Sequence, residues 1–139
     1  MTERQRTVAC AALLLAYIVI RFGDLLLLGN GLFLSDIWRY FYPLRHVVRD
    51  ALLAGEFPWW NRNLSGGQPM AANPAYAAFY PGSLPILIGS YRFGFNLHIV
   101  LHVCLAIVAM FLFLREDGRS RTASMVGALA FATGGYFLS

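Results

Sequence analysis

One segment limits the possible folds of this chain more than any other. Residues 95–114, FNLHIVLHVCLAIVAMFLFL, contain no Asp, Glu, Lys or Arg, and about 20 apolar residues are what a helix needs to cross the core of a bilayer. The composition indicates the same class, because 58% of the residues are hydrophobic and 13% are charged, whereas soluble domains have roughly 45–50% and 25%. We therefore predict an all-α, polytopic membrane protein.

Two further segments are predicted to cross the membrane, which gives three transmembrane helices in a single, incomplete membrane domain. The first covers residues 7–28, and the third covers residues 122–139, which are rich in small side chains of the kind found where membrane helices pack. Arginines precede the first helix and recur in the short loop 115–121 between the second and third. Because such basic flanks stay in the cytoplasm, we expect a cytoplasmic N-terminus and an outer, extracytoplasmic loop at residues 29–94.

The outer loop begins with a stretch that is predicted to form an interfacial amphipathic helix at about residues 36–54. Ser35 is a plausible N-cap and Gly55 a plausible stop. Apolar side chains recur at helical spacing on one face, with polar ones opposite, as in helices that lie in the plane of the membrane interface. Pro43 interrupts the pattern, so we expect a short turn from Asp36, a kink, and then a helix.

The rest of the outer loop, residues 55–90, is rich in Gly, Pro and aromatic residues. Its first part reads GEFPWWNRNLSGGQPMAANPAYAAFYPGSLP, in which the prolines deny a continuous helix and the glycines permit tight turns. Disordered linkers lack so many aromatic rings. We therefore predict an ordered loop of defined shape, packed on the outer ends of the helices.

This stretch resembles the opening of the YfhO-type bacterial membrane proteins. The shared elements are a G-x-x-P-x-W-N run, a Gly pair with a following Pro, then N-P and F-Y-P, which are residues 55–61, 66–69, 73–74 and 79–81 here. The resemblance implies an N-terminal fragment of a longer protein in the bacterial plasma (inner) membrane, whose remaining helices would be its partners. It also implies similarity to the GT-C class of membrane glycosyltransferases, which take a sugar from a polyprenyl-phosphate carrier.

In the GT-C class an acidic residue soon after the first membrane helix serves as catalytic base or helps to form the acceptor or metal site, and the matching position is Asp36. A carboxylate there can take the proton of a sugar hydroxyl as the hydroxyl attacks the anomeric carbon. The alternative role of Asp36 is to stabilise the start of the helix as a charged first-turn residue.

Other side chains of the outer loop are predicted to bind the substrate. Arginines suit the carrier phosphate, aromatic rings stack on sugars, and amides hydrogen-bond to them. The predicted residues are Arg39, Arg45, Arg49, Arg62, Trp60, Asn61, Asn73 and Tyr80. Each arginine has the alternative of a solvated or lipid-facing charge, and each Asn that of a turn residue. We expect Asp50 and Glu56 to face solvent, with contact to the substrate as the alternative.

No cofactor is certain, although a divalent metal is possible. His98 and His102 stand four residues apart and could grip a metal, but no third ligand has suitable spacing, and a polar stripe between helices explains them as well. The scattered arginines form no basic run, so nucleic acid is not an expected partner, whereas membrane lipid and a polyprenyl-phosphate-linked sugar are. The two cysteines lie in apolar runs and imply no disulfide.

The function expected from the resemblance is sugar transfer from the lipid carrier to an extracytoplasmic acceptor. This chain alone would be inactive, because later helices complete the cleft in such enzymes. The rival hypothesis is a non-enzymatic multi-pass membrane protein, with a role in transport or assembly, that uses the outer loop for contacts with partners.

Overall fold

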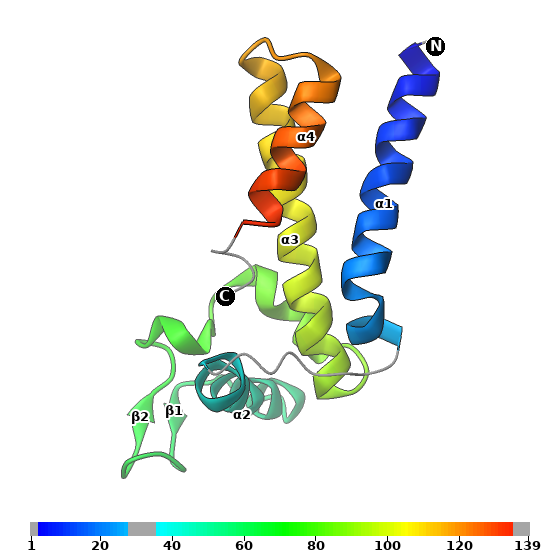
Figure 1. Ribbon diagram of the computed structural model, residues 1–139. Coiled ribbons are helices and arrows are strands. Elements are labelled where there is room, and N and C mark those ends of the chain that lie inside the picture. The colour runs from blue at the N-terminus through cyan, green and yellow to red at the C-terminus, as the bar shows by residue number, and fades with distance from the viewer. Residues whose placement is uncertain (1–2, 28–35, 135–139) are drawn as a thin grey trace. The chain divides into compact units, whose positions relative to one another are not determined.

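The computed structural model describes residues 3–27 and 36–134, and these are mostly helical, as predicted (Figure 1). The chain divides into two compact units. The helical unit comprises residues 1–28 and 99–139, and the loop unit comprises residues 29–98. Helix α3, Tyr91–Glu116, begins in the loop unit and continues into the helical unit.

The helical unit contains α1 (Glu3–Leu27), the larger part of α3, and α4 (Arg121–Ala132). Among the described residues, α3 is the one helix that is long and apolar enough to cross a membrane. It starts four residues before the predicted segment, and α1 also starts four residues early. The helix expected at 122–139 is described as far as Ala132, and residues 135–139 lie outside the described part of the chain.

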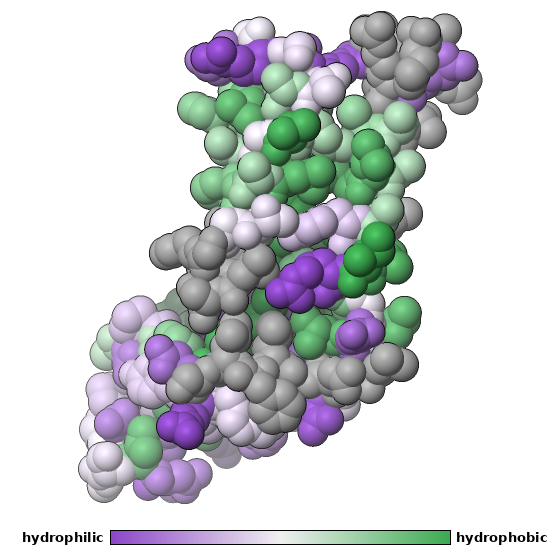
Figure 2. All heavy atoms as spheres, viewed as in Figure 1, coloured by the Kyte–Doolittle hydropathy of each residue, from purple (hydrophilic) through white to green (hydrophobic). Residues whose placement is uncertain are grey.

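Helix α4 has small residues on its buried face and in close contact with α3. Ser124, Ala128 and Ala132 recur every four residues on the buried face of α4. Gly127 is also close to α3, because a Cβ atom at this position would stand 2.6 Å from the Leu114 side chain. In Figure 2 the hydrophobic colour covers the middle of this unit, and the hydrophilic colour gathers at the end where α3 and α4 join.

The loop unit begins with a π-helical turn, η1 (Ile37–Phe41), which leads directly into α2 (Tyr42–Leu53). Pro43 falls in the first turn of α2, where its missing N–H costs no helical hydrogen bond. The predicted apolar face is the one that packs: Leu44 and Val48 are buried against Met70 and Tyr76. Ser35, the expected N-cap, lies outside the described residues.

The Gly- and Pro-rich segment is ordered around a short hairpin. Strands β1 (Trp60–Asn61) and β2 (Gln68–Pro69) pair antiparallel, with Trp60 opposite Pro69. Gly67 has a φ of +118°, and a Cβ atom there would lie 2.4 Å from Nε1 of Trp60. A glycine is therefore required at this position, both for its backbone conformation and for the close approach of the indole ring.

Two 3₁₀ helices follow, η2 (Pro74–Tyr76) and η3 (Pro81–Leu87). Ser83 links them, because its Oγ donates to the carbonyl of Tyr80 at 2.6 Å or that of Ala77 at 3.1 Å. The start of α3 then packs closely on η3: a Cβ atom on Gly94 would stand 2.6 Å from the carbonyl oxygen of Pro85. The irregular backbone is thus fixed by side-chain hydrogen bonds and tight packing.

Candidate functional site

Two hollows in the loop unit are lined by six of the eight residues that were predicted to bind substrate. The hairpin pocket, of about 670 Å³, lies beside β1 and the end of α2 and includes Trp60, Asn61 and Arg62 in its lining. The arginine pocket, of about 440 Å³, is lined by Arg45, Asn73 and Tyr80 together with small and aromatic residues of the segment 71–80. Each pocket is formed by residues of the loop unit alone.

Aromatic rings and carboxylates face each other in the hairpin pocket. Trp59 and Trp60 are 64% and 54% exposed, so part of each ring is accessible to a ligand. The ring of Phe57 packs against that of Trp59, with centroids 4.2 Å apart. Asp50 and Glu56 are exposed, as expected, and they also line the pocket. Flat apolar faces with hydrogen-bond acceptors beside them suit a sugar ring, whose C–H face stacks while its hydroxyls donate.

Asn61 has a structural role in this pocket. It is only 3% exposed, its Nδ2 donates to the Tyr76 hydroxyl at 3.0 Å, and its Oδ1 accepts from the backbone N–H of Asn63 at 2.9 Å. Both ends of the amide are therefore engaged within the protein. Asn61 therefore fits the alternative of a turn residue better than that of a substrate-binding residue. Asn61 would affect a ligand only indirectly, by holding its neighbour Trp60 in position.

The arginine pocket contains a half-buried cation. Arg45 donates from Nη1 to Nε2 of His98, and its guanidinium lies over the rings of Phe41 and Phe95 at 5.9 and 6.0 Å. Burial lowers the pKa of Arg45 from its ordinary value, and the nearby Tyr91 and Tyr80 act in the opposite direction. An arginine starts so far above neutrality that the group stays charged.

The contacts of His98 determine its tautomer. Because Nε2 accepts from Arg45, Nδ1 carries the proton and donates to the carbonyl of Gly82 at 2.7 Å. His98 is thus a neutral imidazole with both nitrogens engaged, and this leaves neither available as a metal ligand. Within the described ranges 3–27 and 36–134, no three His, Cys, Asp or Glu side chains gather as a metal site would require.

Tyr80 and Asn73 are the other two predicted residues in the lining of the arginine pocket. Tyr80 is 46% exposed. The Asn73 side chain accepts from the backbone N–H of Ala75 at 3.0 Å and so caps η2. Asn73 can still offer its amide nitrogen as a donor, because the capping bond uses the oxygen alone.

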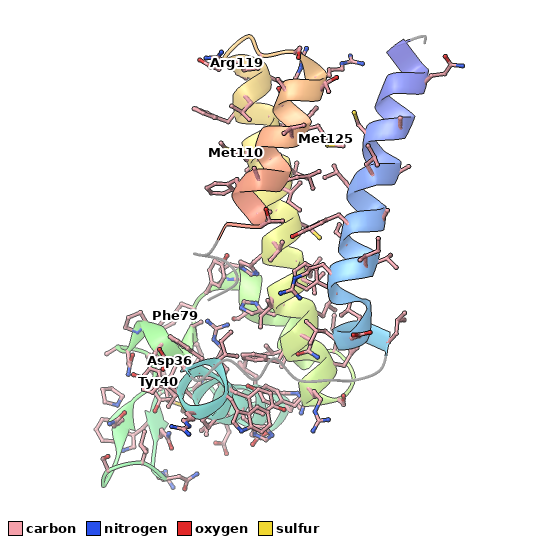
Figure 3. The ribbon with its side chains drawn as sticks, viewed as in Figure 1. Asp36, Tyr40, Phe79, Met110, Arg119 and Met125 are labelled. Atoms are coloured by element: carbon pink, nitrogen blue, oxygen red, sulfur yellow. The ribbon has the colours of Figure 1, made fainter. Side chains whose placement is uncertain are left out.

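Asp36 and two predicted arginines do not line either pocket. Asp36 and Arg39 are exposed at the start of the loop unit's helical stretch, and the Asp36 side chain makes no capping hydrogen bond to η1 (Figure 3). Arg49 instead has a structural position: its Nη2 donates to the carbonyl of Gly89 at 2.7 Å, and its guanidinium lies over the ring of Tyr91. Arg49 therefore links α2 to the start of α3.

Several residues that line the hairpin pocket are not among the eight predicted binding residues. Phe57, Trp59 and Asn63 line it, as do the two carboxylates of Asp50 and Glu56. The signal that could have found Glu56 is its position next to an aromatic run, since a carboxylate beside exposed rings is a common feature of polar ligand sites. Asp50 reaches the hairpin pocket because it lies in the last turn of α2, which ends at Leu53, just before the aromatic run.

The chain matches no protein-family model, no curated protein and no solved structure.

Proposed function

We propose that this chain is the N-terminal portion of a YfhO-type membrane protein with GT-C-like glycosyltransferase activity, and that its loop unit binds the sugar and the phosphate of a polyprenyl-phosphate donor. In this proposal α1, α3 and α4 belong to three transmembrane helices, with the N-terminus in the cytoplasm and the loop unit on the outer face. The observation that carries it is the hairpin pocket, in which exposed indole rings stand beside two carboxylates and an arginine.

The hairpin pocket supplies the two kinds of contact that sugars need. The exposed faces of Trp59 and Trp60 offer apolar area to the C–H face of a sugar ring. Asp50 and Glu56 accept hydrogen bonds from hydroxyls, and Arg62 donates them. Asp50 also accepts from Nδ1 of His46 at 2.9 Å, which restrains the carboxylate.

Arg45 is the residue best suited to the carrier phosphate. The ion pairs of the described residues join His46 to Asp50 and Arg119 to Asp117, and neither includes Arg45. A half-buried cation is costly unless an anion compensates it. The protein supplies aromatic faces and a neutral imidazole at this site, and a bound phosphate would supply the missing negative charge.

Asp36 is proposed as the base. As the acceptor hydroxyl attacks the anomeric carbon, its proton passes to the Asp36 carboxylate, and the bond from that carbon to the carrier phosphate breaks. The leaving phosphate takes the electron pair, and Arg45, which is proposed to bind the carrier phosphate, stabilises its charge. Asp36 is exposed and makes no side-chain capping hydrogen bond, so its carboxylate is accessible to an acceptor.

The sugar-binding part is tested on this chain in lipid nanodiscs by saturation-transfer NMR with free monosaccharides. We expect Trp60→Ala to weaken the transfer signal several-fold, because stacking on an aromatic ring is worth roughly 0.5–1.5 kcal/mol. Trp38→Ala is the matched control, since Trp38 is an exposed tryptophan of the same unit that does not line the pocket. Equal signals from the chain and both variants would refute a sugar site at the hairpin.

The catalytic part is tested in bacteria that carry the complete protein. Asp36→Asn keeps the size of the side chain and removes its basicity, so glycan transfer should fall by about 10²–10⁴-fold at unchanged protein level. Full transfer by this variant would favour the non-enzymatic rival.

A further inference from the structure

We propose that the helical unit holds one anionic diacyl phospholipid, with the lipid phosphate between Arg115 and Arg121 and one acyl chain in each of two adjoining apolar hollows. The site lies where α3 turns into α4, and every residue of it belongs to the helical unit. It shares no residue with the pockets of the proposed sugar transfer and does not depend on that function.

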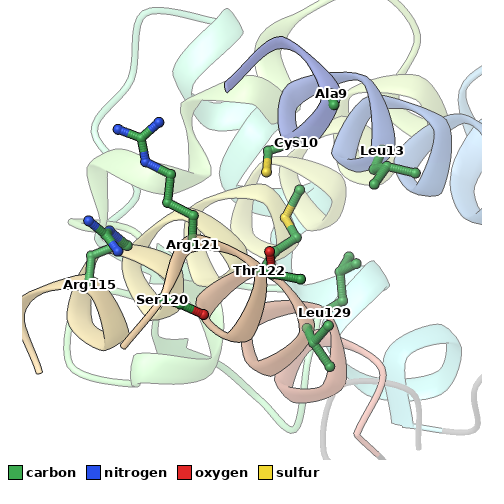
Figure 4. Close-up of a pocket in the computed structure, with 10 residues that line it drawn as sticks. Ala9, Cys10, Leu13, Arg115, Ser120, Arg121, Thr122 and Leu129 are labelled. Atoms are coloured by element: carbon green, nitrogen blue, oxygen red, sulfur yellow. The ribbon is translucent and has the colours of Figure 1, made fainter. Parts of the chain in front are cut away.

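The larger hollow has about 700 Å³ and lies between α1 and α4 (Figure 4). Its walls are mostly apolar, with Leu13 from α1 facing Val126 and Leu129 from α4. The two arginine side chains stand together at one side of it in Figure 4, while the apolar side chains lie further along the helices. The hollow therefore has a charged mouth and an apolar interior, which is the polarity of a phospholipid.

A smaller hollow of about 380 Å³ opens from the same charged mouth. It is lined by Leu14, Phe111 and Leu112, and it shares Cys10, Arg115, Arg121 and Met125 with the larger one. One cationic mouth thus leads to two apolar spaces. A ligand with one anionic head and two hydrocarbon chains matches this arrangement, whereas a free phosphate would leave both spaces unused.

The contacts at the mouth favour an anionic head group. Arg115 donates from Nη1 to the carbonyl of Arg119 at 2.6 Å, and this bond holds its guanidinium at the turn. Arg121 is the first residue of α4, where the positive end of the helix dipole adds to its charge. Arg119 differs from both, because it does not line either hollow.

The test measures lipid retention by native mass spectrometry after release of the chain from nanodiscs that contain equal amounts of phosphatidylglycerol and phosphatidylcholine with the same acyl chains. We expect one phosphatidylglycerol to stay bound to the unmodified chain. Arg115→Gln with Arg121→Gln should lower that retention at least tenfold, since hydrogen bonds to charged groups are worth roughly 1.5–3 kcal/mol. Arg119→Gln is the matched control, an arginine of the same turn, and should retain the lipid.

A second variant tests the hollows without changing charge. Val126 is 63% exposed, and it lines the larger hollow but not the smaller one. Val126→Trp should therefore fill the larger hollow and reduce retention of the diacyl lipid several-fold. Circular dichroism should show that the variant keeps its fold. Single-chain lysophosphatidylglycerol should be retained less than diacyl phosphatidylglycerol. Added inorganic phosphate should not displace the diacyl lipid.

Three results on lipid retention would overturn the proposal, and so would displacement of the lipid by inorganic phosphate. They are equal retention of both lipids, loss of phosphatidylglycerol from Arg119→Gln as complete as from the double variant, and full retention in Val126→Trp. Displacement by inorganic phosphate would show a phosphate site in place of a lipid site.

Discussion

The helical unit and the loop unit satisfy their backbones in different ways. In the helical unit, side-chain hydrogen bonds such as that from Thr133 to the carbonyl of Leu129 stay within one turn of helix. In the loop unit some side-chain hydrogen bonds are local too, but others join distant residues: Asn61 to Tyr76, Arg49 to Gly89, and Tyr91 to the carbonyl of Tyr42. A helix pairs its own N–H and C=O groups, whereas an irregular segment must recruit side chains to do so.

The two units also differ in what they expose. The helices present aliphatic side chains outward, such as Leu105 and Leu112 of α3, each more than half exposed. The loop unit presents aromatic rings, many of them with a polar atom, such as Trp59, Trp60 and Tyr80. The first pattern suits a hydrocarbon environment, and the second suits the boundary between head groups and water. The four predictions below test this contrast, from the largest expected effect to the smallest.

Removing the central ring of the loop unit should have the largest effect. Tyr76 is fully buried against α2 and accepts from Asn61, so Tyr76→Ala should lower the free energy of unfolding by about 3–5 kcal/mol. Tryptophan fluorescence during denaturant titration measures it, because all three tryptophans lie at positions 38, 59 and 60 of this unit. Tyr40→Ala is the control, since Tyr40 is 48% exposed. Similar losses from both variants would contradict the proposed core.

A charge on the exposed face of α3 should have the next largest effect. Leu105 is 62% exposed in the middle of this helix, and an arginine at the centre of a membrane helix costs about 2.5–3.5 kcal/mol of insertion. We expect Leu105→Arg to reduce the fraction of α3 inserted in microsomes, as read from engineered glycosylation sites. Leu64→Arg, on the exposed hairpin turn of the loop unit, should leave insertion unchanged. Unimpaired insertion of Leu105→Arg would show that α3 does not face lipid there.

A glycine of each unit provides the third comparison. Gly94→Ala forces a Cβ atom against the backbone of η3, and overpacking of this kind costs about 1–3 kcal/mol. Gly23→Ala in α1 meets nothing within 4 Å and should stabilise the helix by up to about 1 kcal/mol. Thermal unfolding of the two variants in detergent should therefore shift in opposite directions, and a shift in the same direction would contradict the close packing at Gly94.

The sequence was most informative where one physical rule dominates. Apolar length and helical spacing predicted the positions of α1, α2 and α3 to within a few residues, because burial of an apolar face decides both the element and its orientation. The packing of Leu44 and Val48 of α2 follows from the same rule. The apolar patterns contain no information on the strands, since two-residue strands have no measurable period.

The site was predictable by residue type and less so by arrangement. The aromatic, arginine and amide side chains that line the pockets were chosen because their chemistry fits a sugar phosphate. Whether a given Asn faces a ligand or a turn depends on contacts far apart in sequence, such as the bond between Asn61 and Tyr76. Arg45 and Trp60 line different pockets. Which pocket each one lines depends on the path of the chain through residues 62–80, and local sequence patterns do not predict that path.

Helix caps should give the smallest effect and the most direct comparison of the units. Asn73 caps η2 by accepting from Ala75, and Ser120 caps α4 by accepting from Ala123. Loss of a cap costs about 0.5–2 kcal/mol. We expect the cost of Asn73→Ala to lie near the upper end of this range. The reason is that η2 carries Tyr76 into the core and that the freed N–H of Ala75 belongs to a packed turn. Ser120→Ala should lie near the lower end, because Ser120 is exposed and water can replace the hydroxyl. Hydrogen exchange of the two freed amides measures both costs in one experiment. If the Ala123 amide lost as much protection as the Ala75 amide, the helical unit would depend on its side-chain hydrogen bonds as much as the loop unit does.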